Sequence, residues 1–442
     1  MSMRVARTAA VVLLLVSGAS LSLAQQQHMS NLERSRALDM LRTTASDVKK
    51  YYYDPELHGV DFDAKIALAR QQIQTSNSFE MAMSHIAAML DTLNDSHTFF
   101  LPPQPAYRHD YGFTYQLIGD RCFVTHVHPR TDAEKKGLKP GDEILTINGY
   151  NVTREDYRKM QYVFHILRPQ PGLHLQIADS PGVPRQFDVL ARIRETKRNS
   201  DVPGESDAGG VWDLLREEET QDHLMRARYF AVGDHLLVVK VPEFFFSIAE
   251  VEAMIGKARK SPNLIMDLRG NPGGSIETLK YLVGGVFDKE VKIADRVGRK
   301  ETKPEVARGL HSPYGGKLLV LVDSKSASAA ELFARIIQLE KRGTVVGDRT
   351  LGSVMESKRY REKAGPNTAI FYGASITEWD LIMSDGKSLE HTGVTPDEIL
   401  MPDANAIAMG KDPVLAKAAE MLGIKLSEED AGKAFPYEWA PE

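Results

Sequence analysis

The stretch that decides the fold is KLLVLVDSKSASAAELFARIIQ, residues Lys317 to Gln338, where a hydrophobic strand turns into a helix. Leu318 to Val322 is a continuous apolar run, typical of a buried strand. From Ala329 onward apolar residues recur with helical spacing, at Leu332, Phe333, Ile336 and Ile337. Ser328 lies at the junction, where free backbone N–H groups at the start of a helix can hold a developing oxyanion. The segment predicts a strand–turn–helix unit with Ser328 as a candidate nucleophile.

Ser328 also has a purely structural interpretation. The sequence Ser328-Ala329-Ala330-Glu331 has the Ser-x-x-Glu pattern of a capping box before an apolar run. Taken alone, this pattern favours a helix cap. A serine hydroxyl is also a poor nucleophile near neutral pH unless a base lies within hydrogen-bonding reach. Two further segments favour catalysis because they supply an anion-binding loop and a base.

A glycine-rich loop is the first of these segments. Leu264 to Leu268 reads as a buried strand and Ile276 to Phe287 as a helix. Between them lies Arg269-Gly270-Asn271-Pro272-Gly273-Gly274. Adjacent glycines let main-chain N–H groups approach a ligand with no Cβ in the way. An ordinary glycine-rich turn is the alternative, but a six-residue loop of this composition between strand and helix is more specific.

The second segment is MLDTLNDSHTFFLPP, Met89 to Pro103. His97 follows Ser96 at the end of an amphipathic helix. A histidine in this position can simply interact with the negative end of the helix dipole. Its reference pKa of about 6.5 also makes it a suitable general base.

Together the three segments resemble the C-terminal-processing (tail-specific) serine peptidase superfamily. The resemblance rests on Asp267-Leu-Arg-Gly-Asn-Pro-Gly-Gly274 after a strand and on Ser326-Ala-Ser-Ala329 before a helix. The sequence Asp95-Ser-His-Thr98 is similar to the branch related to the tricorn core protease, in which a histidine serves as base. The likeness covers roughly residues 30 to 405. It implies an α/β core of the ClpP/crotonase type.

One departure distinguishes the branches of this family. In the lysine branch a Gly-Lys pair follows the nucleophile, after a Val-Gly-Glu-x-Thr-like stretch. Here Val346 to Gly352 corresponds to that stretch, and Ser353 stands where the lysine would be. A hydroxyl cannot be a general base at neutral pH, so a Ser-Lys dyad at this position is excluded. Lys358 is nearby, but it belongs to the charged run Lys358-Arg-Tyr-Arg361, which we interpret as a solvated face.

The resemblance then implies the remaining members of the site. His97 is the expected base, Ser96 is the serine beside it, and Glu390 takes the position of a distant glutamate that orients the histidine. Glu390 lies in Asp385 to Asp397, which resembles a Glu-Gly-x-Gly-Val-x-Pro-Asp stretch with His391 in place of the usual glycine. A surface carboxylate is the alternative for Glu390. The rivals are His391 as base and Asp385 or Asp380 as orienting acid.

The expected chemistry is acyl transfer. Ser328 attacks, His97 relays the proton, and water hydrolyses the acyl-enzyme. The oxyanion hole is expected from the N–H of Ala329 together with that of Gly273 or Gly274. The sequence has neither a His-Glu-x-x-His motif nor a clustered Cys/His spacing, so we expect no metal and no cofactor.

A strand-rich unit precedes the core. Gly137 to Gly149, GLKPGDEILTING, closely resembles the turn and strand of PDZ domains, with an Asn-Gly hairpin turn at its end. Gly112, Phe113 and Thr114 are in place to form the carboxylate-binding loop, although they depart from the usual Gly-Leu-Gly-Phe. Such a unit would capture peptide C-termini beside an exposed strand edge. The alternative is that it only positions its neighbours.

The sequence therefore predicts a multidomain α/β protein with an N-terminal helical bundle, a PDZ-like β-rich domain and a ClpP/crotonase-like core. We expect a signal peptide at 1–24, a helical domain at 31–103, a PDZ-like domain at 106–193 and a linker or flap at 194–228. The α/β peptidase core is expected at 229–404 and a C-terminal tail helix at 405–442, with an exposed end that includes Trp439.

The N-terminus and the composition indicate the compartment. Arg4 and Arg7 precede an apolar run, Ala9 to Val16, and Ser22-Leu-Ala24 fits a small-x-small cleavage site. A periplasmic or secreted protein with no stable membrane span after cleavage is expected. Cys122 is the single cysteine, so it forms no intramolecular disulfide and reads as a small strand hydrophobe. With a net charge of −5 and no long basic block, nucleic acid is not an expected partner.

The predicted function is that of a serine endopeptidase acting on polypeptides. Two alternatives stay open. The missing lysine at Ser353 would also fit an inactive PDZ-containing binding or scaffold protein. A crotonase-like acyl-CoA enzyme shares the core type, but acyl-CoA substrates are cytosolic, which the secretory signal and the PDZ-like unit argue against.

Overall fold

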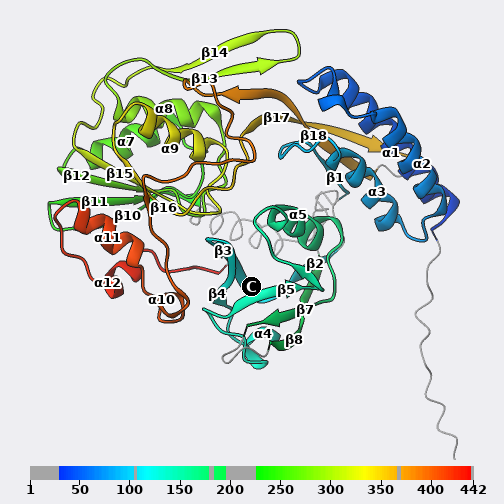
Figure 1. The fold of residues 1–442 in the computed structure, drawn as a ribbon, viewed down its shortest axis with the longest axis horizontal. Coiled ribbons are helices and arrows are strands. Elements are labelled where there is room, and N and C mark those ends of the chain that lie inside the picture. The colour runs from blue at the N-terminus through cyan, green and yellow to red at the C-terminus, as the bar shows by residue number, and fades with distance from the viewer. Residues whose placement is uncertain (1–28, 104–106, 179–183, 196–224, 366–369, 440–442) are drawn as a thin grey trace, which may run out of the picture.

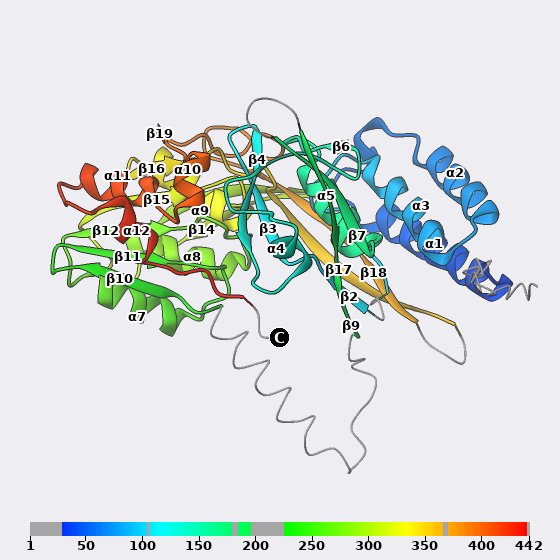
Figure 2. The ribbon, with the colours of Figure 1, turned by 90° about the horizontal axis from the view of Figure 1, so that it is seen from below.

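The computed structural model describes residues 29–103, 107–178, 184–195, 225–365 and 370–439. The predicted signal peptide and most of the predicted linker or flap lie outside these residues. In Figure 1 the N-terminal helical region, the PDZ-like unit and the α/β core surround a common centre. Figure 2, turned by 90°, shows the PDZ-like strands between the other two parts. Within the described ranges, no helix is long and apolar enough to cross a membrane.

The N-terminal region consists of three helices, α1 (Asn31–Tyr51), α2 (Phe62–Thr75) and α3 (Phe79–Asp91), with a short 3₁₀ turn at Leu57–Gly59. Side chains cap the starts of α2 and α3, because Asp61 accepts the N–H of Ala64 and Ser78 accepts that of Met81. Apolar residues of the three helices pack against the hairpin of strands β17 (Met355–Ala364) and β18 (Ile370–Ile382). This contact joins the helical region to the core.

That hairpin belongs to a five-stranded sheet. The strands of this sheet are β1 (Phe99–Leu101), β13 (Val291–Gly298), β14 (Thr302–Ala307), β17 (Met355–Ala364) and β18 (Ile370–Ile382). Strand β1 pairs antiparallel with β18, with Phe100 opposite Ala374. Because His97 lies two residues before β1, this pairing fixes the predicted base relative to the core.

The PDZ-like unit has six strands, β3 (Phe113–Ile118), β4 (Arg121–Val127), β5 (Glu143–Ile147), β6 (Tyr150–Asn151), β7 (Gly172–Ile177) and β8 (Arg185–Leu190). It also has helices α4 (Asp132–Lys135) and α5 (Tyr157–Tyr162), the latter continued by a π-helical turn at Val163–Leu167. Strands β2 (Tyr107–Asp110) and β9 (Arg192–Glu195) form a separate ribbon. Asn148 and Gly149 both have positive φ, at 52° and 81°, as the predicted hairpin turn requires.

The core is built on a second six-stranded sheet. Its order is β10 (Arg228–Val232), β11 (Leu236–Lys240), β12 (Asn263–Asp267), β15 (Lys317–Val322), β16 (Thr344–Gly347) and β19 (Glu398–Ile399). All neighbours from β11 to β19 are parallel, and β10 is an antiparallel edge. Helices α7 (Ile248–Ala258), α8 (Ile276–Val286) and α9 (Ala329–Leu339) cover one face.

The chain after residue 404 differs from the prediction of one tail helix with an exposed end. It contains α10 (Ala404–Ala408), α11 (Pro413–Met421) and α12 (Glu428–Gly432). Apolar residues of α11 pack on the sheet face opposite α7, α8 and α9. On that face they form one cluster with buried strand side chains such as Ile265 and Leu321. Trp439 is partly buried, with its ring 4.6 Å from that of His128. The tail is therefore part of the fold.

Candidate active site

Ser328 occupies a strained turn between β15 and α9. Its φ and ψ are 53° and −120°, a conformation that costs a residue with a side chain about 1–3 kcal/mol. Two acceptors hold its backbone N–H, namely the carbonyl of Ser353 at 3.0 Å and Glu331 Oε2 at 2.9 Å. Sharp strand-to-helix turns of this kind are found where a serine nucleophile must be exposed.

Glu331 is the acidic member of the predicted capping box, and it does more than cap the helix. Its side chain is fully buried. Besides the N–H of Ser328, it accepts hydrogen bonds from Gly352 N at 2.8 Å, Ser353 N at 2.9 Å and Thr350 Oγ1 at 2.5 Å. Burial raises the pKa of Glu331 to about 7, although these donors favour the ionised form. Glu331 thus joins the nucleophile turn to residues 350–353.

The glycine-rich loop lies directly against Ser328. A Cβ on Gly273 would lie 2.7 Å from Ser328 Cβ and 3.0 Å from Ala329 N, so only glycine fits there. The N–H of Gly273 donates to Asn271 Oδ1 at 2.8 Å. Among the described residues we find no partner for the N–H groups of Gly274 and Ala329. The local geometry therefore favours Gly274 over Gly273 as the second oxyanion donor.

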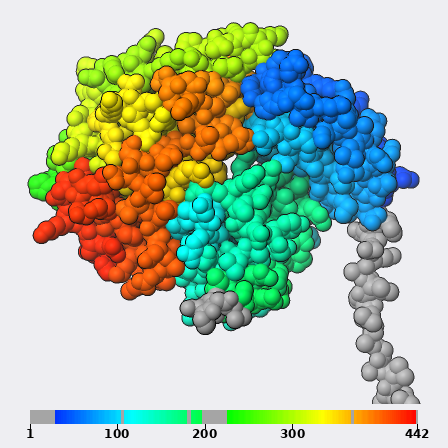
Figure 3. Space-filling view, viewed as in Figure 1, coloured from blue at the N-terminus to red at the C-terminus, as the bar shows by residue number. Residues whose placement is uncertain are grey.

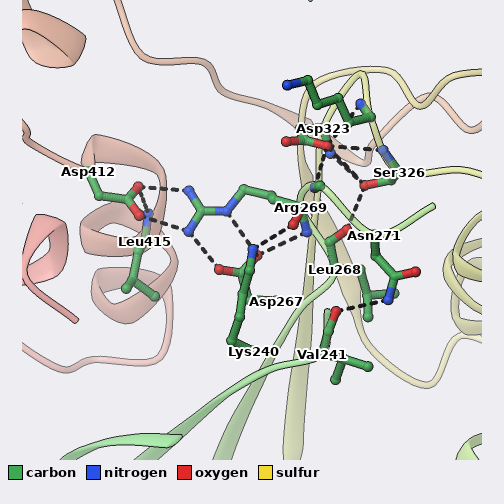
Figure 4. A network of polar contacts seen from close by, with 12 residues as sticks. Lys240, Val241, Asp267, Leu268, Arg269, Asn271, Asp323, Ser326, Asp412 and Leu415 are labelled. Atoms are coloured by element: carbon green, nitrogen blue, oxygen red, sulfur yellow. Dashed lines mark hydrogen bonds and ion pairs between the residues drawn. The ribbon is translucent and has the colours of Figure 1, made fainter. Parts of the chain in front are cut away.

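A separate ionic network supports the base of this loop (Figure 4). Arg269 forms two hydrogen bonds with Asp412, at 2.9 and 2.7 Å, and two side-chain bonds with Asp267, at 2.9 and 2.8 Å. Burial opposes ionisation of Asp267, but the charges of Arg269 and Lys240 hold the pKa of its carboxyl below the ordinary value. Asp323 accepts the N–H of Gly270 at 2.9 Å. The loop is thus anchored at both of its sides.

The three residues implied by the family resemblance, Ser96, His97 and Glu390, are in direct contact. Ser96 Oγ lies 2.7 Å from His97 Nδ1 and donates to Glu390 Oε2 at 2.9 Å. Ser96 N donates to Glu390 Oε1 at 2.7 Å, and Val354 N donates to Oε2 at 2.8 Å. Asp95 Oδ1 accepts the N–H of His97 at 2.7 Å. These contacts hold the histidine by its side chain and by its backbone.

The proton on the histidine can be assigned by counting donors. When Glu390 is ionised its carboxylate can only accept, so the single hydroxyl proton of Ser96 points to Glu390. The Ser96 oxygen must then accept from His97 Nδ1. With the proton on Nδ1, Nε2 of His97 carries the lone pair that a general base needs.

His97 is kept neutral by its surroundings. Burial lowers its pKa to about 4, and the charge of Arg158 acts in the same direction, while Asp95 opposes both. Arg158 comes from α5 of the PDZ-like unit and lies over the ring of Phe99. Burial also raises the pKa of Glu390. The PDZ-like unit therefore contributes a charge to the electrostatics of His97.

The three parts of the chain enclose a cavity of about 1180 Å³ beside this group. Its wall includes Ser96, Ser353 and Arg158, together with residues of α3 and of the π-helical turn at Val163–Leu167. Figure 3 shows a hollow where the helical region, the PDZ-like unit and the β17–β18 region meet. The PDZ-like unit is held there by Arg154, whose Nη2 lies 2.7 Å from Asp348 Oδ2.

The predicted carboxylate-binding loop lies at the start of β3. Gly112 has a φ of 73°, and its N–H donates to Asp110 Oδ1 at 2.8 Å. Phe113 is buried in the PDZ-like core. Thr114 Oγ1 lies 3.2 Å from His126 Nδ1. Burial alternates along β3, and Phe113 and Tyr115 point inward. The side chain of Thr114 therefore lies on the outward face of the strand.

Three of the four rival residues have other surroundings, whereas His391 lies beside Glu390, with its Nε2 3.7 Å from Glu390 Oε1, and lines the same cavity. Lys358 is exposed on β17, as the solvated-face interpretation predicts. His391 Nε2 bonds to the carbonyl of Asn94 at 2.8 Å. Asp385 pairs with Arg335 at 2.6 Å and Asp380 accepts from Ser388 Oγ at 2.9 Å, so neither is placed as the orienting acid. Cys122 is buried, and burial raises the pKa of its thiol to about 12, in keeping with a core residue.

Sequence reasoning missed two functions of residues in this site. Ser353 entered only as the residue that replaces a lysine, yet its hydroxyl donates to Ser96 Oγ at 2.9 Å. Asp412 was assigned to a tail, yet it completes the shell of Arg269. The Pro413 that follows Asp412 marks a helix start and could have pointed to a cap, but not to its ionic partner.

Comparison with known proteins assigns two parts of the chain. Residues 235–400 match the model of peptidase family S41, and residues 103–178 match the PDZ domain. The carboxy-terminal processing protease CtpB of Bacillus subtilis is 23% identical, covering 83% of this chain and 72% of its own length. The tail-specific protease of Haemophilus influenzae is 25% identical, covering 58% of this chain and 36% of its own length.

Solved structures agree with the fold class. The crystal structure of mature CPAF matches with a TM-score of 0.63 at 16% identity, covering 85% of this chain and 94% of the other. This likeness concerns the fold alone. Together with the two domain matches it confirms the predicted order of helical region, PDZ domain and α/β core. Residues 235–400 therefore form the peptidase family S41 domain of a serine-type peptidase, and a PDZ domain precedes it in the chain.

Proposed function

We propose that this protein is a serine endopeptidase in which His97, rather than a lysine, activates Ser328. The observation that carries the proposal is the hydrogen-bonded set His97–Ser96–Glu390, combined with a serine at 353 where the lysine branch has its base. Ser353 also links the two halves of the site, since its carbonyl accepts the N–H of Ser328 and its hydroxyl donates to Ser96.

The reaction follows from these positions. Ser328 Oγ attacks the peptide carbonyl carbon while His97 Nε2 takes its proton, and the imidazolium is stabilised through Ser96 by Glu390. The oxyanion is held by the N–H groups of Ala329 and Gly274, each worth about 10²–10³ in turnover in comparable sites. His97 then returns the proton to the leaving amine. Water hydrolyses the ester by the same route in reverse.

The PDZ domain has the role of binding substrate C-termini in this proposal. Gly112, Phe113 and Thr114 lie at the start of β3, where a carboxylate-binding loop is expected. The Asp110 carboxylate on the N–H of Gly112 is a resident acceptor that an incoming carboxylate would displace. The chain acts in the periplasm or outside the cell, as its N-terminal sequence predicts.

Cleavage of an unstructured protein such as casein tests the proposal. The purified chain would be compared with Ser328→Ala, His97→Ala and Ser353→Lys, and thermal melts would confirm that each variant folds. We expect the parent to cut and the first two variants to be inactive. If a folded parent cuts neither casein nor a broad peptide library, the alternative of an inactive PDZ-containing scaffold protein is supported instead.

A further inference from the structure

Ser353 makes three hydrogen bonds, and each one reaches a different part of the site. Its carbonyl accepts the N–H of Ser328 at 3.0 Å, and its own N–H donates to Glu331 Oε2 at 2.9 Å. Its hydroxyl donates to Ser96 Oγ at 2.9 Å. The first two contacts use backbone atoms, so any residue could make them. The third depends on the serine side chain.

The direction of the third bond follows from the protons available. Ser96 gives its single hydroxyl proton to the Glu390 carboxylate, so its oxygen can only accept from its other neighbours. Those neighbours are His97 Nδ1 at 2.7 Å and Ser353 Oγ at 2.9 Å. Two donors fill the two lone pairs of the Ser96 oxygen. Ser353 is therefore the donor that completes its hydrogen bonding.

The surroundings of this bond leave little room for another arrangement. Ser353 and Ser96 are both buried, at 6% exposure each. The residues on either side of Ser353 are tied to the two carboxylates of the site, because Gly352 N donates to Glu331 and Val354 N donates to Glu390. The backbone at 352–354 thus cannot shift without loosening both halves of the site.

We propose that Ser353 is a positioning residue for the histidine base. Its hydroxyl holds the Ser96 oxygen beside His97 Nδ1, so that Nδ1 keeps its proton and Nε2 keeps the lone pair that would accept the proton of Ser328. The Ser353 hydroxyl is small enough to reach the buried Ser96 oxygen at 2.9 Å. A lysine at position 353 would instead place an amine there, which could itself act as a base. The proposal rests on the proposed function, because it assigns Ser353 a role only if His97 is the base.

The chain offers a matched control. Ser375 Oγ donates to Ser357 Oγ at 2.9 Å, so it forms a second serine–serine pair of the same length, in which Ser375 is buried and Ser357 half-buried. That pair joins β17 to β18, and its two hydroxyls bond to each other and not to Ser96, His97 or Glu390. Ser375→Ala removes the same kind of bond, and a purely structural effect would appear equally in both variants.

The test is steady-state cleavage of a fluorogenic peptide by Ser353→Ala, Ser353→Thr and Ser375→Ala in the full chain. A net hydrogen bond of about 1 kcal/mol corresponds to roughly a fivefold rate change, so we expect kcat of Ser353→Ala to fall about fivefold with KM unchanged. Ser353→Thr, which keeps the hydroxyl, restores kcat. Ser375→Ala matches the parent. Equal kcat values for Ser353→Ala and Ser375→Ala would overturn the proposal.

A double-mutant cycle with Ser96→Ala separates positioning from folding. If Ser353 acts through Ser96, its substitution has no further effect on kcat once Ser96 is alanine. Additive losses contradict the proposal, even where Ser353→Ala lowers the melting temperature. A proton NMR signal from His97 Nδ1–H that disappears in Ser353→Ala but stays in Ser375→Ala would support it. The same assay separates failure of this proposal from failure of the proposed function. If His97 is not the base, His97→Ala cleaves like the parent.

Discussion

Ser96 and Glu390 lie 294 residues apart in the sequence and are joined by two hydrogen bonds, of 2.7 and 2.9 Å. One partner belongs to the N-terminal region and the other to the loop after β18. The pairing of β1 with β18 brings the two segments together. The base of the proposed mechanism is therefore assembled by strand pairing between the helical region and the core, and not by a local motif.

Arg158 is predicted to set the pH at which the base becomes protonated. His97 must be neutral to act, and because its pKa is lowered to about 4, activity should persist below pH 6.5. Burial is the largest cause and Arg158 the next, so Arg158→Gln should raise the pKa of His97 and move the acidic limb of kcat/KM to higher pH. The measurement is a pH profile from 4 to 9.

The neighbouring Lys159 provides the control for this experiment. Its ammonium pairs with Asp91 at 3.0 Å on the same cavity wall. Lys159→Gln removes one positive charge from the same helix without a charge effect on His97. An identical shift of the acidic limb in both variants, or no shift in Arg158→Gln, would show that Arg158 does not tune the base.

Glu331 is predicted to matter for both stability and rate. Glu331→Gln keeps the shape, but its amide N–H₂ replaces one carboxylate oxygen and faces the donors of that oxygen, either Gly352 N and Thr350 Oγ1 or Ser353 N and Ser328 N. Each buried donor left unsatisfied costs about 1–3 kcal/mol, so we expect a clear fall in the free energy of unfolding. We also expect lower kcat, since Ser328 N–H loses an acceptor. Denaturant unfolding and peptide cleavage measure the two effects; a variant with parental values in both would refute the role.

The C-terminal segment is predicted to compete with substrate for the PDZ domain. The Tyr437 ring stacks on His126 at 3.8 Å, and the Tyr437 hydroxyl interacts with the Thr114 side chain. Truncation after Ala434 should therefore strengthen binding of a peptide with a free C-terminus. Aromatic pairs contribute about 0.5–1.5 kcal/mol each, which corresponds to a severalfold change in Kd.

Fluorescence anisotropy with a free-acid peptide and its amide measures this effect. Lys433→Ala, an exposed change in the same tail, is the control. Tighter binding of the free acid by the truncated chain, and not by Lys433→Ala, is the expected result. Weaker binding after truncation would mean that the tail supports the PDZ domain instead of covering its binding surface.

The sequence predicts those elements of the fold and the site whose pattern lies within one short segment. The β15–Ser328–α9 unit follows from an apolar run that changes to helical spacing, and α9 begins at the expected residue. The glycine loop is predicted because a strand and a helix flank it. Ser96, His97 and Glu390 follow from a family pattern; Ser96 contacts both other residues, and the roles of the three stay predictions.

Contacts between distant segments have no such signal. The pairing of Arg269 with Asp412 spans 143 residues, and neither sequence neighbourhood indicates the other. The role proposed for Ser353 depends on its contact with the Ser96 hydroxyl. The pairing of β1 with β18 brings Ser96 to the core, and no local sequence signal indicates it. Trp439 looked like an exposed end because its partner, His128, lies in another domain.

The most direct test of the central claim is the rate at which Ser328 is acylated by a fluorophosphonate, followed by mass spectrometry of the intact protein. We expect one label on Ser328 in the parent chain and none in Ser328→Ala. A general base contributes about 10²–10⁴-fold, so His97→Ala should react slower by that factor while keeping its melting temperature. If folded His97→Ala reacts at the parental rate, His97 is not the base and the account is wrong.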